Sequence, residues 1–397
     1  MTSLNQTKIA FLLGSGVSIS VGRIPPMKEI TKRILSGKGI MRRTDGTYDL
    51  GHATEGFMNE YIDKSIKFLK RIKIEADSYY CDSEVNYEDL YYMANQINDS
   101  EYREYDNPVV QPFIDKIIPD IEKLLTSKEG EHLDEWTLAV ISHEVINYIK
   151  CVVWRILSSK KPEDTNRLRF FKDACLDKDS FNVDIFTLNH DTILEDYLTQ
   201  TGIKLMDGFG DPENGVRYWN PYLFVEKPSE IKFFKLHGSL NWFMLCSKVG
   251  NRTSTRIGIP LNGDYWHTKD SNGRLQDPVN KTPEFLVGTF NKMFDYTSSI
   301  YAEMHCRFYY RLRDIEQVVI CGYGFGDKGI NRRLIEWVYS SLEHKFIIID
   351  PDPNLKERSR GIIANNWDSL STQNKLVFIQ DKIENISWQD IKNRLKK

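Results

Sequence analysis

Several features that mark other protein classes are missing from this 397-residue sequence. No apolar run approaches the ~20 residues that a membrane-spanning helix needs. Residues 1–7 are polar, unlike the start of a signal peptide. We therefore expect a cytoplasmic protein with no membrane contact. The formal net charge is only −3, so no overall field attracts nucleic acid, and direct nucleic-acid binding is not indicated.

Closely spaced cysteine pairs are also missing. The six cysteines are widely scattered and contain no CxxC pair: Cys81, Cys151, Cys175, Cys246, Cys306 and Cys321. A disulfide framework is not expected in a chain of this length and setting. Structural zinc sites usually draw their ligands from closely spaced pairs. We therefore expect neither a disulfide scaffold nor a zinc site.

The sequence does contain a series of short apolar runs, most of them followed by a glycine or polar turn. They lie at residues 8–13, 182–187, 231–236, 317–321, 345–350 and 375–379. Apolar residues at helical spacing separate the later runs, for example at 297–313 and 328–343. Buried runs that alternate with helices are typical of an α/β fold. We predict a Rossmann-like, doubly wound and mostly parallel sheet.

The stretch between the first two runs is predicted to be different. Apolar residues recur there at helical spacing, at 27–35, 55–76, 109–125 and 133–158, and no strand is expected between about 24 and 180. We therefore predict a large, mostly helical insertion at residues 25–179. The sheet domain would then consist of residues 1–24 and 180–397.

Two segments have unusual composition or pattern. Residues 77–106 hold seven tyrosines and nine acidic residues against one arginine, Arg103. Such a segment is typical of a solvated loop and helix face, and the alternative is a surface for a partner. Residues 241–290 are predicted to form turns and short strands.

Chemistry-bearing residues follow five of the predicted strands, at the edge where open α/β sheets bind ligands. Gly14-Ser15-Gly16-Val17-Ser18 follows the first run. Its glycines permit either a close approach to a pyrophosphate or simply a tight turn into a helix. Thr187-Leu188-Asn189-His190-Asp191 follows the second. Asn189 and Asp191 either cap the next helix or bind a ligand, Asn189 through a ribose hydroxyl or a water and Asp191 through a carboxamide.

The remaining three groups also allow two interpretations. His237, in Leu236-His237-Gly238-Ser239, suits general-base chemistry near neutral pH, although a hydrogen-bonded structural histidine is the alternative. Gly322-Tyr323-Gly324-Phe325-Gly326-Asp327 allows a ligand to approach the backbone closely, and Asp327 is equally suited to cap a helix. Asp350 ends an apolar run, where an acid either holds the hydroxyls of an adenine ribose or forms a turn.

Taken in order, GSGVS, TLNHD, LHGS and GYGFGD resemble the sirtuin signatures GAGxS, TQNxD, LHG and GTS. In particular, the chain resembles the SIR2-like domains of bacterial anti-phage defence systems, such as the SIR2 subunit of SIR2–HerA type systems. The resemblance covers residues 8–22 and about 180–350, which is the whole predicted sheet.

This resemblance implies that NAD is the substrate, and it assigns roles to matching positions. Asn189, Asp191 and His237 would act in catalysis, with Asn189 on the nicotinamide ribose, Asp191 on the nicotinamide amide and His237 as the catalytic histidine. The other matching positions would line the NAD site: Gly14, Ser15, Gly16, Ser18, Thr187, Gly322, Tyr323, Gly324, Asp327 and Asp350. Asp350 stands where sirtuins usually place an asparagine.

The departures from the sirtuin pattern concern deacylation. Deacylase sirtuins carry GIPDFR after the glycine loop, whereas this chain has Gly22-Arg23-Ile24-Pro25-Pro26-Met27 and lacks their four-cysteine zinc module. SIR2-like NAD hydrolases share these losses.

We therefore expect an NAD+ hydrolase that forms nicotinamide and ADP-ribose and depletes NAD during anti-phage defence. A homo-oligomer and a separately encoded partner, with a HerA-type ATPase as the first choice, are also implied. The alternatives are an NAD or ADP-ribose sensor without turnover and a sirtuin-type deacylase. A nuclease is disfavoured because the sequence offers no metal-binding carboxylate cluster.

Overall fold

The computed structural model describes residues 6–51, 58–80, 84–104, 107–125, 136–226, 230–289 and 292–395. Predictions that involve Phe57, Cys81 or residues 105–106 lie outside these ranges. The chain divides into two compact units. The first unit comprises residues 1–24, 161–286 and 293–397, and the second comprises residues 25–160 and 287–292. Residues 161–179, assigned above to the insertion, therefore cluster with the sheet.

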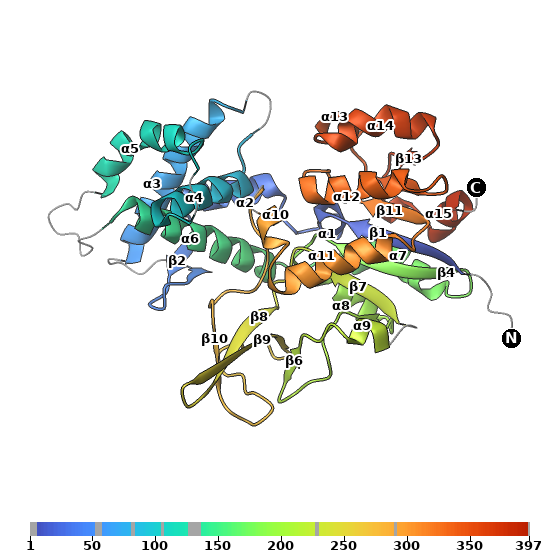
Figure 1. Cartoon of the computed structure of the whole chain (residues 1–397), viewed down its shortest axis with the longest axis horizontal. Helices are drawn as coiled ribbons and strands as arrows, with labels where there is room; N and C mark the ends of the chain where they lie inside the picture. The colour runs from blue at the N-terminus through green and yellow to red at the C-terminus, as the bar shows by residue number, and fades with distance from the viewer. Residues whose placement is uncertain are drawn as a thin grey trace. The chain divides into compact units, whose positions relative to one another are not determined.

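The first unit is built on a seven-stranded parallel sheet, which confirms the predicted α/β fold (Figure 1). The strand order is β13-β12-β11-β1-β4-β7-β5, and every neighbouring pair in it is parallel. The strands are β1 (Thr7–Leu13), β4 (Phe181–Thr187), β5 (Leu205–Met206), β7 (Ile231–Lys235), β11 (Gln317–Cys321), β12 (Lys345–Ile349) and β13 (Leu376–Ile379). Most of their side chains are buried because helices cover both faces, whereas the edge strand β13 is mostly half-buried.

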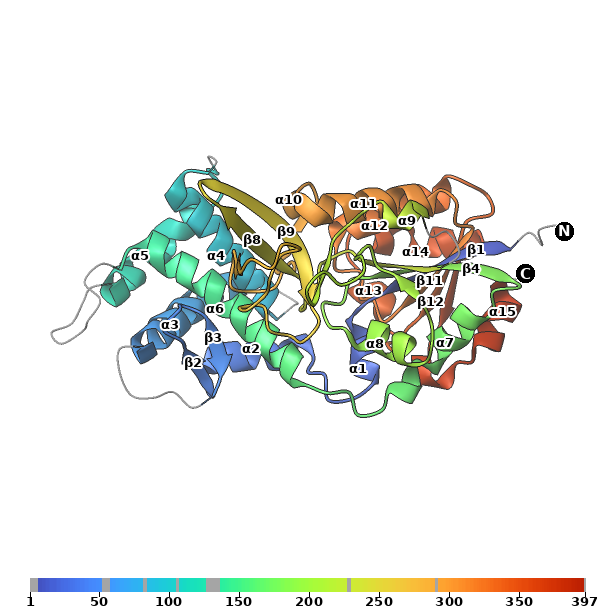
Figure 2. The same ribbon diagram turned by 90° about the horizontal axis from the view of Figure 1, so that it is seen from below.

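Helices from different parts of the chain cover the two faces of this sheet (Figure 2). On one face, Ala10 and Leu12 of β1 share a buried cluster with side chains of α11, α12 and α14. On the other, Phe11 contacts Phe170 and Phe171 of α7 edge to face, and it also contacts Trp388 of α15. The helices of this unit are α1 (Ser15–Ser20), α7 (Arg169–Leu176), α8 (Ile193–Gln200), α9 (Leu223–Glu226), α11 (Ser299–Leu312), α12 (Lys328–Tyr339), α13 (Leu355–Arg358), α14 (Ile362–Thr372) and α15 (Trp388–Leu395).

A smaller antiparallel sheet completes the first unit. Its strand order is β10-β8-β9-β6. The bounds are β6 (Val216–Tyr218), β8 (Phe243–Val249), β9 (Arg252–Pro260) and β10 (Gln276–Pro278). Three of these strands come from the segment that the sequence predicted to hold turns and short strands.

The second unit is mostly helical. It contains α2 (Met27–Ser36), α3 (Met58–Asp77), α4 (Tyr87–Tyr102), α5 (Gln111–Leu125), α6 (Leu138–Ser159) and the start of α10 (Lys292–Asp295). A short hairpin, β2 (Ile40–Arg42) with β3 (Tyr48–Leu50), was not expected from the sequence. Its turn is held by Asp45, whose Oδ1 accepts from the amide of Thr47 at 2.9 Å. Strands of three residues are too short to produce a recognisable pattern, but the Asp45-Gly46 pair was an available turn signal.

The tyrosine-rich segment folds largely into α4, which has a buried face. Tyr87, Leu90, Ala94 and Ile97 are buried, and Asn86 forms a reciprocal capping box with Asp89 at the helix start.

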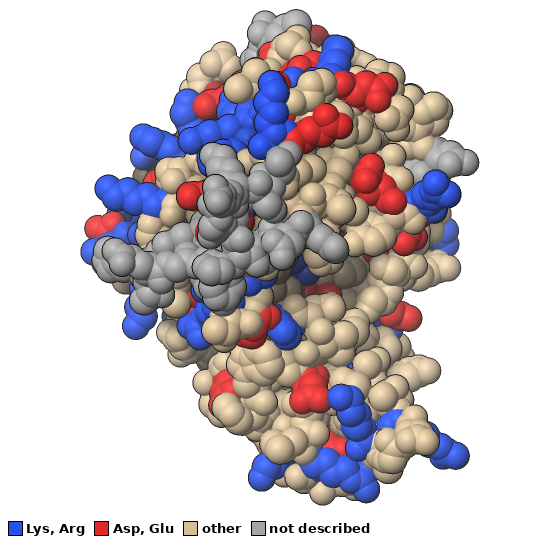
Figure 3. All heavy atoms as spheres, turned by 90° about the vertical axis from the view of Figure 1, so that its left-hand side faces the viewer, with Lys and Arg blue, Asp and Glu red and all other residues tan. Residues whose placement is uncertain are grey.

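Over the face of the molecule drawn in Figure 3, basic and acidic side chains are interspersed. Among the described residues, no helix is both long and apolar enough to cross a bilayer.

Candidate active site

The order in which strands are added to the sheet reverses between β1 and β11, so the carboxyl ends of these two strands mark a topological switch point. From β1, in the middle of the sheet, the chain continues to β4 on one side, and it later returns to β11 on the other. In open α/β sheets, ligands bind outside the strand ends at such a switch point. The sequence-predicted motifs GSGVS and GYGFGD follow these two strands.

The two glycine loops pack directly against each other. The amide of Gly14 donates to Cys321 O at 3.0 Å, and the amide of Gly16 donates to Gly322 O at 2.9 Å. A Cβ at Gly14 would lie 2.5 Å from Gly322 O, and one at Gly16 would lie 2.6 Å from Gly322 Cα. Close packing of the protein's own backbone therefore requires these glycines, a reason that the sequence did not reveal. Ser15 is exposed at the start of α1.

A hydrogen-bonded network joins the glycine loop to the loop after β4. Asn189 Nδ2 donates to Gly14 O at 3.0 Å and to Ser18 Oγ at 2.9 Å. Ser18 Oγ in turn donates to Asp191 Oδ2 at 2.7 Å. Thr187 Oγ1 accepts from the Asn189 amide at 3.1 Å, which shapes the turn between them. The structure thus brings together Ser18, Asn189 and Asp191, three of the predicted site residues.

Asp191 also contacts the start of α8 and the buried Lys235 at the end of β7. Asp191 Oδ1 accepts from the amide of Ile193, the first residue of α8, at 3.1 Å, but the N-cap position of this helix is Thr192. The buried Lys235 Nζ donates to Asp191 O and pairs with Glu195 Oε1 at 2.7 Å. Desolvation raises the pKa of Glu195 to about 7, although Lys235 acts in the opposite direction. This ion pair was not predicted from the sequence, where a lysine at the end of an apolar strand was the available signal.

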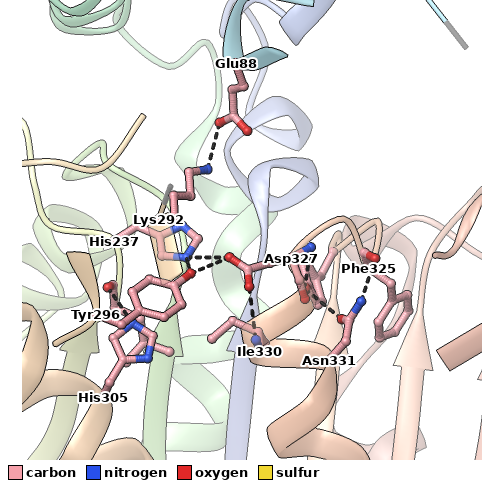
Figure 4. A network of polar contacts seen from close by, with 11 residues as sticks. Glu88, His237, Lys292, Tyr296, His305, Phe325, Asp327, Ile330 and Asn331 are labelled. Atoms are coloured by element: carbon pink, nitrogen blue, oxygen red, sulfur yellow. Dashed lines mark hydrogen bonds and ion pairs between the residues drawn. The ribbon is translucent and has the colours of Figure 1, made fainter. Parts of the chain in front are cut away.

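His237 is buried just after β7, where it contacts two residues from later in the chain, Tyr296 and Asp327. Its Nε2 lies 2.8 Å from Tyr296 Oη and 3.2 Å from Asp327 Oδ2. The Tyr296 hydroxyl donates to the same Asp327 oxygen. Figure 4 shows these three side chains pointing toward one another. Asp327 also accepts from the amide of Ile330 through Oδ1 at 3.0 Å, and it thereby caps α12.

A second buried histidine lies behind Tyr296. The rings of His305 and Tyr296 stack with centroids 3.6 Å apart, and His305 Nε2 lies 3.1 Å from Leu236 O. Since a carbonyl oxygen only accepts, His305 Nε2 carries a proton. Burial, together with the nearby His237, lowers the pKa of His305 to about 3. Neither Tyr296 nor His305 was predicted, because they approach His237 only through the tertiary fold.

The loop after β11 is braced from within by polar side chains. Tyr323 Oη donates to Asn331 Oδ1 at 2.9 Å and lies 3.2 Å from the amide of Asp327, from which it accepts. Asn331 Nδ2 donates to Phe325 O at 2.7 Å. Burial raises the pKa of Tyr323 well above its ordinary value. The Tyr323 hydroxyl is thus part of the scaffold of this loop.

Gly324 lies in the same loop under different constraints. Its backbone φ is not positive, and a Cβ there would meet nothing within 4 Å. Neither conformation nor packing of the protein itself therefore explains a glycine at this position.

The predicted residues thus form two neighbouring groups and one outlying position. Ser18, Asn189 and Asp191 form the first group, and His237 with Asp327 forms the second. The loops that carry them touch, because the amide of Leu240 donates to His190 O at 2.9 Å. Asp350 follows β12, one strand beyond β11, where its Oδ1 accepts from the amide of Asp352 at 2.9 Å and burial raises its pKa.

No group of three or more potential metal-ligating side chains occurs in the described parts of the chain. The described residues of the site are backbone glycines, hydroxyls, amides, carboxylates and the two buried histidines His237 and His305, at the carboxyl edge of a parallel sheet. Such an arrangement is that of a ligand-binding α/β domain with the parts for acid–base chemistry.

Comparison with known proteins agrees with this class. Residues 183–372 match the SIR2-like domain family. No curated protein matches the chain.

Among solved structures, the chain has a low-scoring similarity to two Sir2 homologues, one in complex with ADP-ribose and one in complex with NAD. The first is 12% identical, with 100% of this chain and 94% of that chain covered and a TM-score of 0.37. The second is 10% identical, with coverage of 100% and 92% and a TM-score of 0.36. At these values the likeness carries no inference about activity.

Proposed function

We propose that this chain is an NAD+ hydrolase that cleaves the bond between nicotinamide and ribose. The observation that carries the proposal is that Asn189 and His237 follow the neighbouring strands β4 and β7, with Asn189 hydrogen-bonded to the glycine loop that follows β1. The SIR2-like family match adds support for NAD as the substrate.

The loop after β11 fits a ligand that approaches the backbone closely. The unexplained glycine at Gly324 is accounted for if part of the NAD molecule passes over this loop. The same holds for Gly326, because its φ is not positive either and a Cβ there would meet nothing within 4 Å. Side chains at these positions would then remove space from the substrate and not from the protein.

The reaction needs little acid catalysis because nicotinamide leaves as a neutral molecule. As the bond between C1′ and the pyridinium nitrogen breaks, its electron pair passes to that nitrogen and the ribose acquires oxocarbenium character. A water oxygen then bonds to C1′ and gives up a proton. The products are nicotinamide, ADP-ribose and one proton, so the reaction is balanced. The protein has to position the water and stabilise the developing positive charge.

We assign these tasks to Asn189 and His237. Both hydrogen bonds described for the Asn189 side chain are made by Nδ2, so Oδ1 is the atom that would accept from the water or a ribose hydroxyl. His237 would take the proton from that water or hydroxyl. Positioned proton transfer typically contributes about 10²–10⁴-fold to a rate.

The test is NAD consumption by the purified full-length chain, with nicotinamide and ADP-ribose resolved by chromatography. We expect turnover by the wild type, its loss in Asn189→Ala, and a fall of about 10²–10⁴-fold in His237→Ala with NAD affinity largely kept. His267→Ala is the matched control, because His267 is exposed and pairs with Asp264 on the surface. Thermal melting of each variant checks that it folds.

Other outcomes contradict the proposal in distinct ways. Normal turnover in His237→Ala would remove the assigned role of that residue. Tight NAD binding without turnover, even with the product of a neighbouring gene and phage lysate added, would indicate a sensor. Removal of an acyl group from a lysine peptide would indicate a deacylase.

The cellular role rests on the sequence resemblance alone. We propose that the chain assembles as a homo-oligomer and depletes NAD as an anti-phage effector, together with a HerA-type ATPase. Co-purification with the neighbouring gene product and measurement of cellular NAD during infection test this directly. Unchanged NAD in infected cells that carry both genes would refute the role.

A further inference from the structure

The polar cluster around His237 includes Tyr296 and Asp327, which have no role in the reaction proposed above. His237 comes from the end of β7, Asp327 from the start of α12, and Tyr296 from the segment before α11. Side chains from two other parts of the chain therefore converge on one imidazole nitrogen of His237, Nε2 (Figure 4). The side chains of His237 and Asp327 are only 5% and 11% exposed.

The hydrogen bonds of this cluster indicate which nitrogen of His237 carries hydrogen. A tyrosine hydroxyl has one proton, and that of Tyr296 is donated to Asp327 Oδ2. The 2.8 Å contact between Tyr296 Oη and His237 Nε2 therefore requires Nε2–H as the donor. The same N–H is 3.2 Å from Asp327 Oδ2, so it is directed at both oxygens. In the neutral imidazole, the basic lone pair is then on Nδ1.

We propose that Asp327, with Tyr296 as a bridge, is the positioning residue that selects the Nε2–H form of His237 and stabilises its positive charge after proton uptake at Nδ1. This inference rests on the proposed NAD hydrolysis. When the water or ribose hydroxyl gives its proton to Nδ1, the imidazole becomes a cation whose Nε2–H already faces a carboxylate. No proton has to pass to Asp327, because its charge alone favours the cation.

Among the described contacts of His237, Asp327 supplies a carboxylate that faces Nε2. Tyr296 contacts it from the segment before α11, and His190 contributes a ring from the loop after β4, with centroids 6.2 Å apart. His305 of α11 lies behind Tyr296, and its lowered pKa keeps it neutral near pH 7. Removal of the Asp327 charge should therefore change the protonation of His237 directly.

The substitution Asp327→Asn separates this role from helix capping. The asparagine can still accept from the amide of Ile330 and cap α12, because Asn and Asp are equally good caps. It loses the negative charge that faces His237. Tyr296→Phe keeps the ring and its stack on His305 but removes the bridging hydroxyl. Asp164→Asn is the matched control, since Asp164 caps the short helix at Thr165–Leu168 through the same kind of bond.

The experiment is nitrogen NMR of the full chain labelled at histidine, with the His237 signals assigned by their loss in His237→Ala. We expect the Nε2–H form in neutral wild-type His237 and a fall in its pKa of about one unit or more in Asp327→Asn, with no change in Asp164→Asn. In the activity assay, the acidic limb of the pH–rate profile should move to lower pH. The plateau rate should fall by up to about tenfold for each unit of pKa lost.

The two readouts keep this proposal separate from NAD hydrolysis itself. An unchanged His237 pKa in Asp327→Asn, or an Nδ1–H form in the wild type, would overturn the assignment whether or not NAD is cleaved. If the NMR result is as expected but the wild type does not hydrolyse NAD, the proposed function fails and the arrangement around His237 stands.

Discussion

Ser18 donates a 2.7 Å hydrogen bond from Oγ to Oδ2 of Asp191, across 173 positions of sequence. The same hydroxyl accepts from Asn189 Nδ2 at 2.9 Å. One small side chain at the switch point therefore connects the loop after β1 to the loop after β4. Because Ser18 is only 5% exposed, water cannot easily replace its hydroxyl.

Replacement of Ser18 by alanine should therefore weaken both the fold and the site. Asn189 and Asp191 each lose a buried partner, and we expect the free energy of unfolding to fall by about 1–3 kcal/mol. Turnover should fall as well, because Asn189 is no longer held. Urea unfolding and NAD hydrolysis measure the two effects. Ser20→Ala is the control on the same helix, because its hydroxyl bonds only Val17 O among the described contacts. Equal effects of the two substitutions would contradict this account.

His305 should make the protein sensitive to mild acid. Its pKa falls from 6.5 to about 3 in the folded protein because the ring is buried. The folded state thus resists a proton that the unfolded chain accepts. The stability linked to His305 is fully present above pH 6.5 and is lost as the pH falls toward 3. The full effect is roughly 5 kcal/mol, from about 1.4 kcal/mol per pKa unit.

Urea unfolding of wild type and His305→Gln at pH 8 and pH 5 tests this expectation. The wild type should lose about 2 kcal/mol more than the variant on going to pH 5, since this step covers only about 1.5 units of the titration. His344→Gln is the control, because His344 is only half-buried where it stacks on Trp337. Parallel losses in wild type and His305→Gln would show that another group controls the acid response.

Replacement by alanine should affect the stability of the protein very differently at two glycines of one loop, Gly322 and Gly324. Gly322 has a φ of 59°, and its Cβ would lie 2.7 Å from Gly16 Cα, so Gly322→Ala should destabilise the fold by about 2–4 kcal/mol. Gly324→Ala meets no protein atom within 4 Å, so stability should change by less than about 1 kcal/mol. NAD affinity should nevertheless fall in Gly324→Ala if the substrate passes over this loop. Thermal melting and calorimetric NAD binding measure both, and unchanged affinity would place the ligand elsewhere.

The sequence predicted the sheet well because its strands are buried on both faces. Such strands are continuous apolar runs, and runs at 182–187 and 317–321 stand out from the helices around them. The hairpin at Ile40–Leu50 was missed because three-residue strands have too little pattern to recognise. The motifs after the strands could also be found, since glycines and polar residues follow apolar runs directly.

What the sequence determined by itself is therefore local: buried strands, the turns that follow them, and the residue types placed at the carboxyl edge of the sheet. The contacts of those residues were decided only by the tertiary structure. Tyr296 and Asp327 reach His237 from 59 and 90 positions away along the chain, and Lys235 meets Glu195 across 40 positions. The physical reason is that a hydrogen bond or ion pair of this kind depends on how strands are ordered and how helices return to the sheet, which residue spacing along the chain does not record.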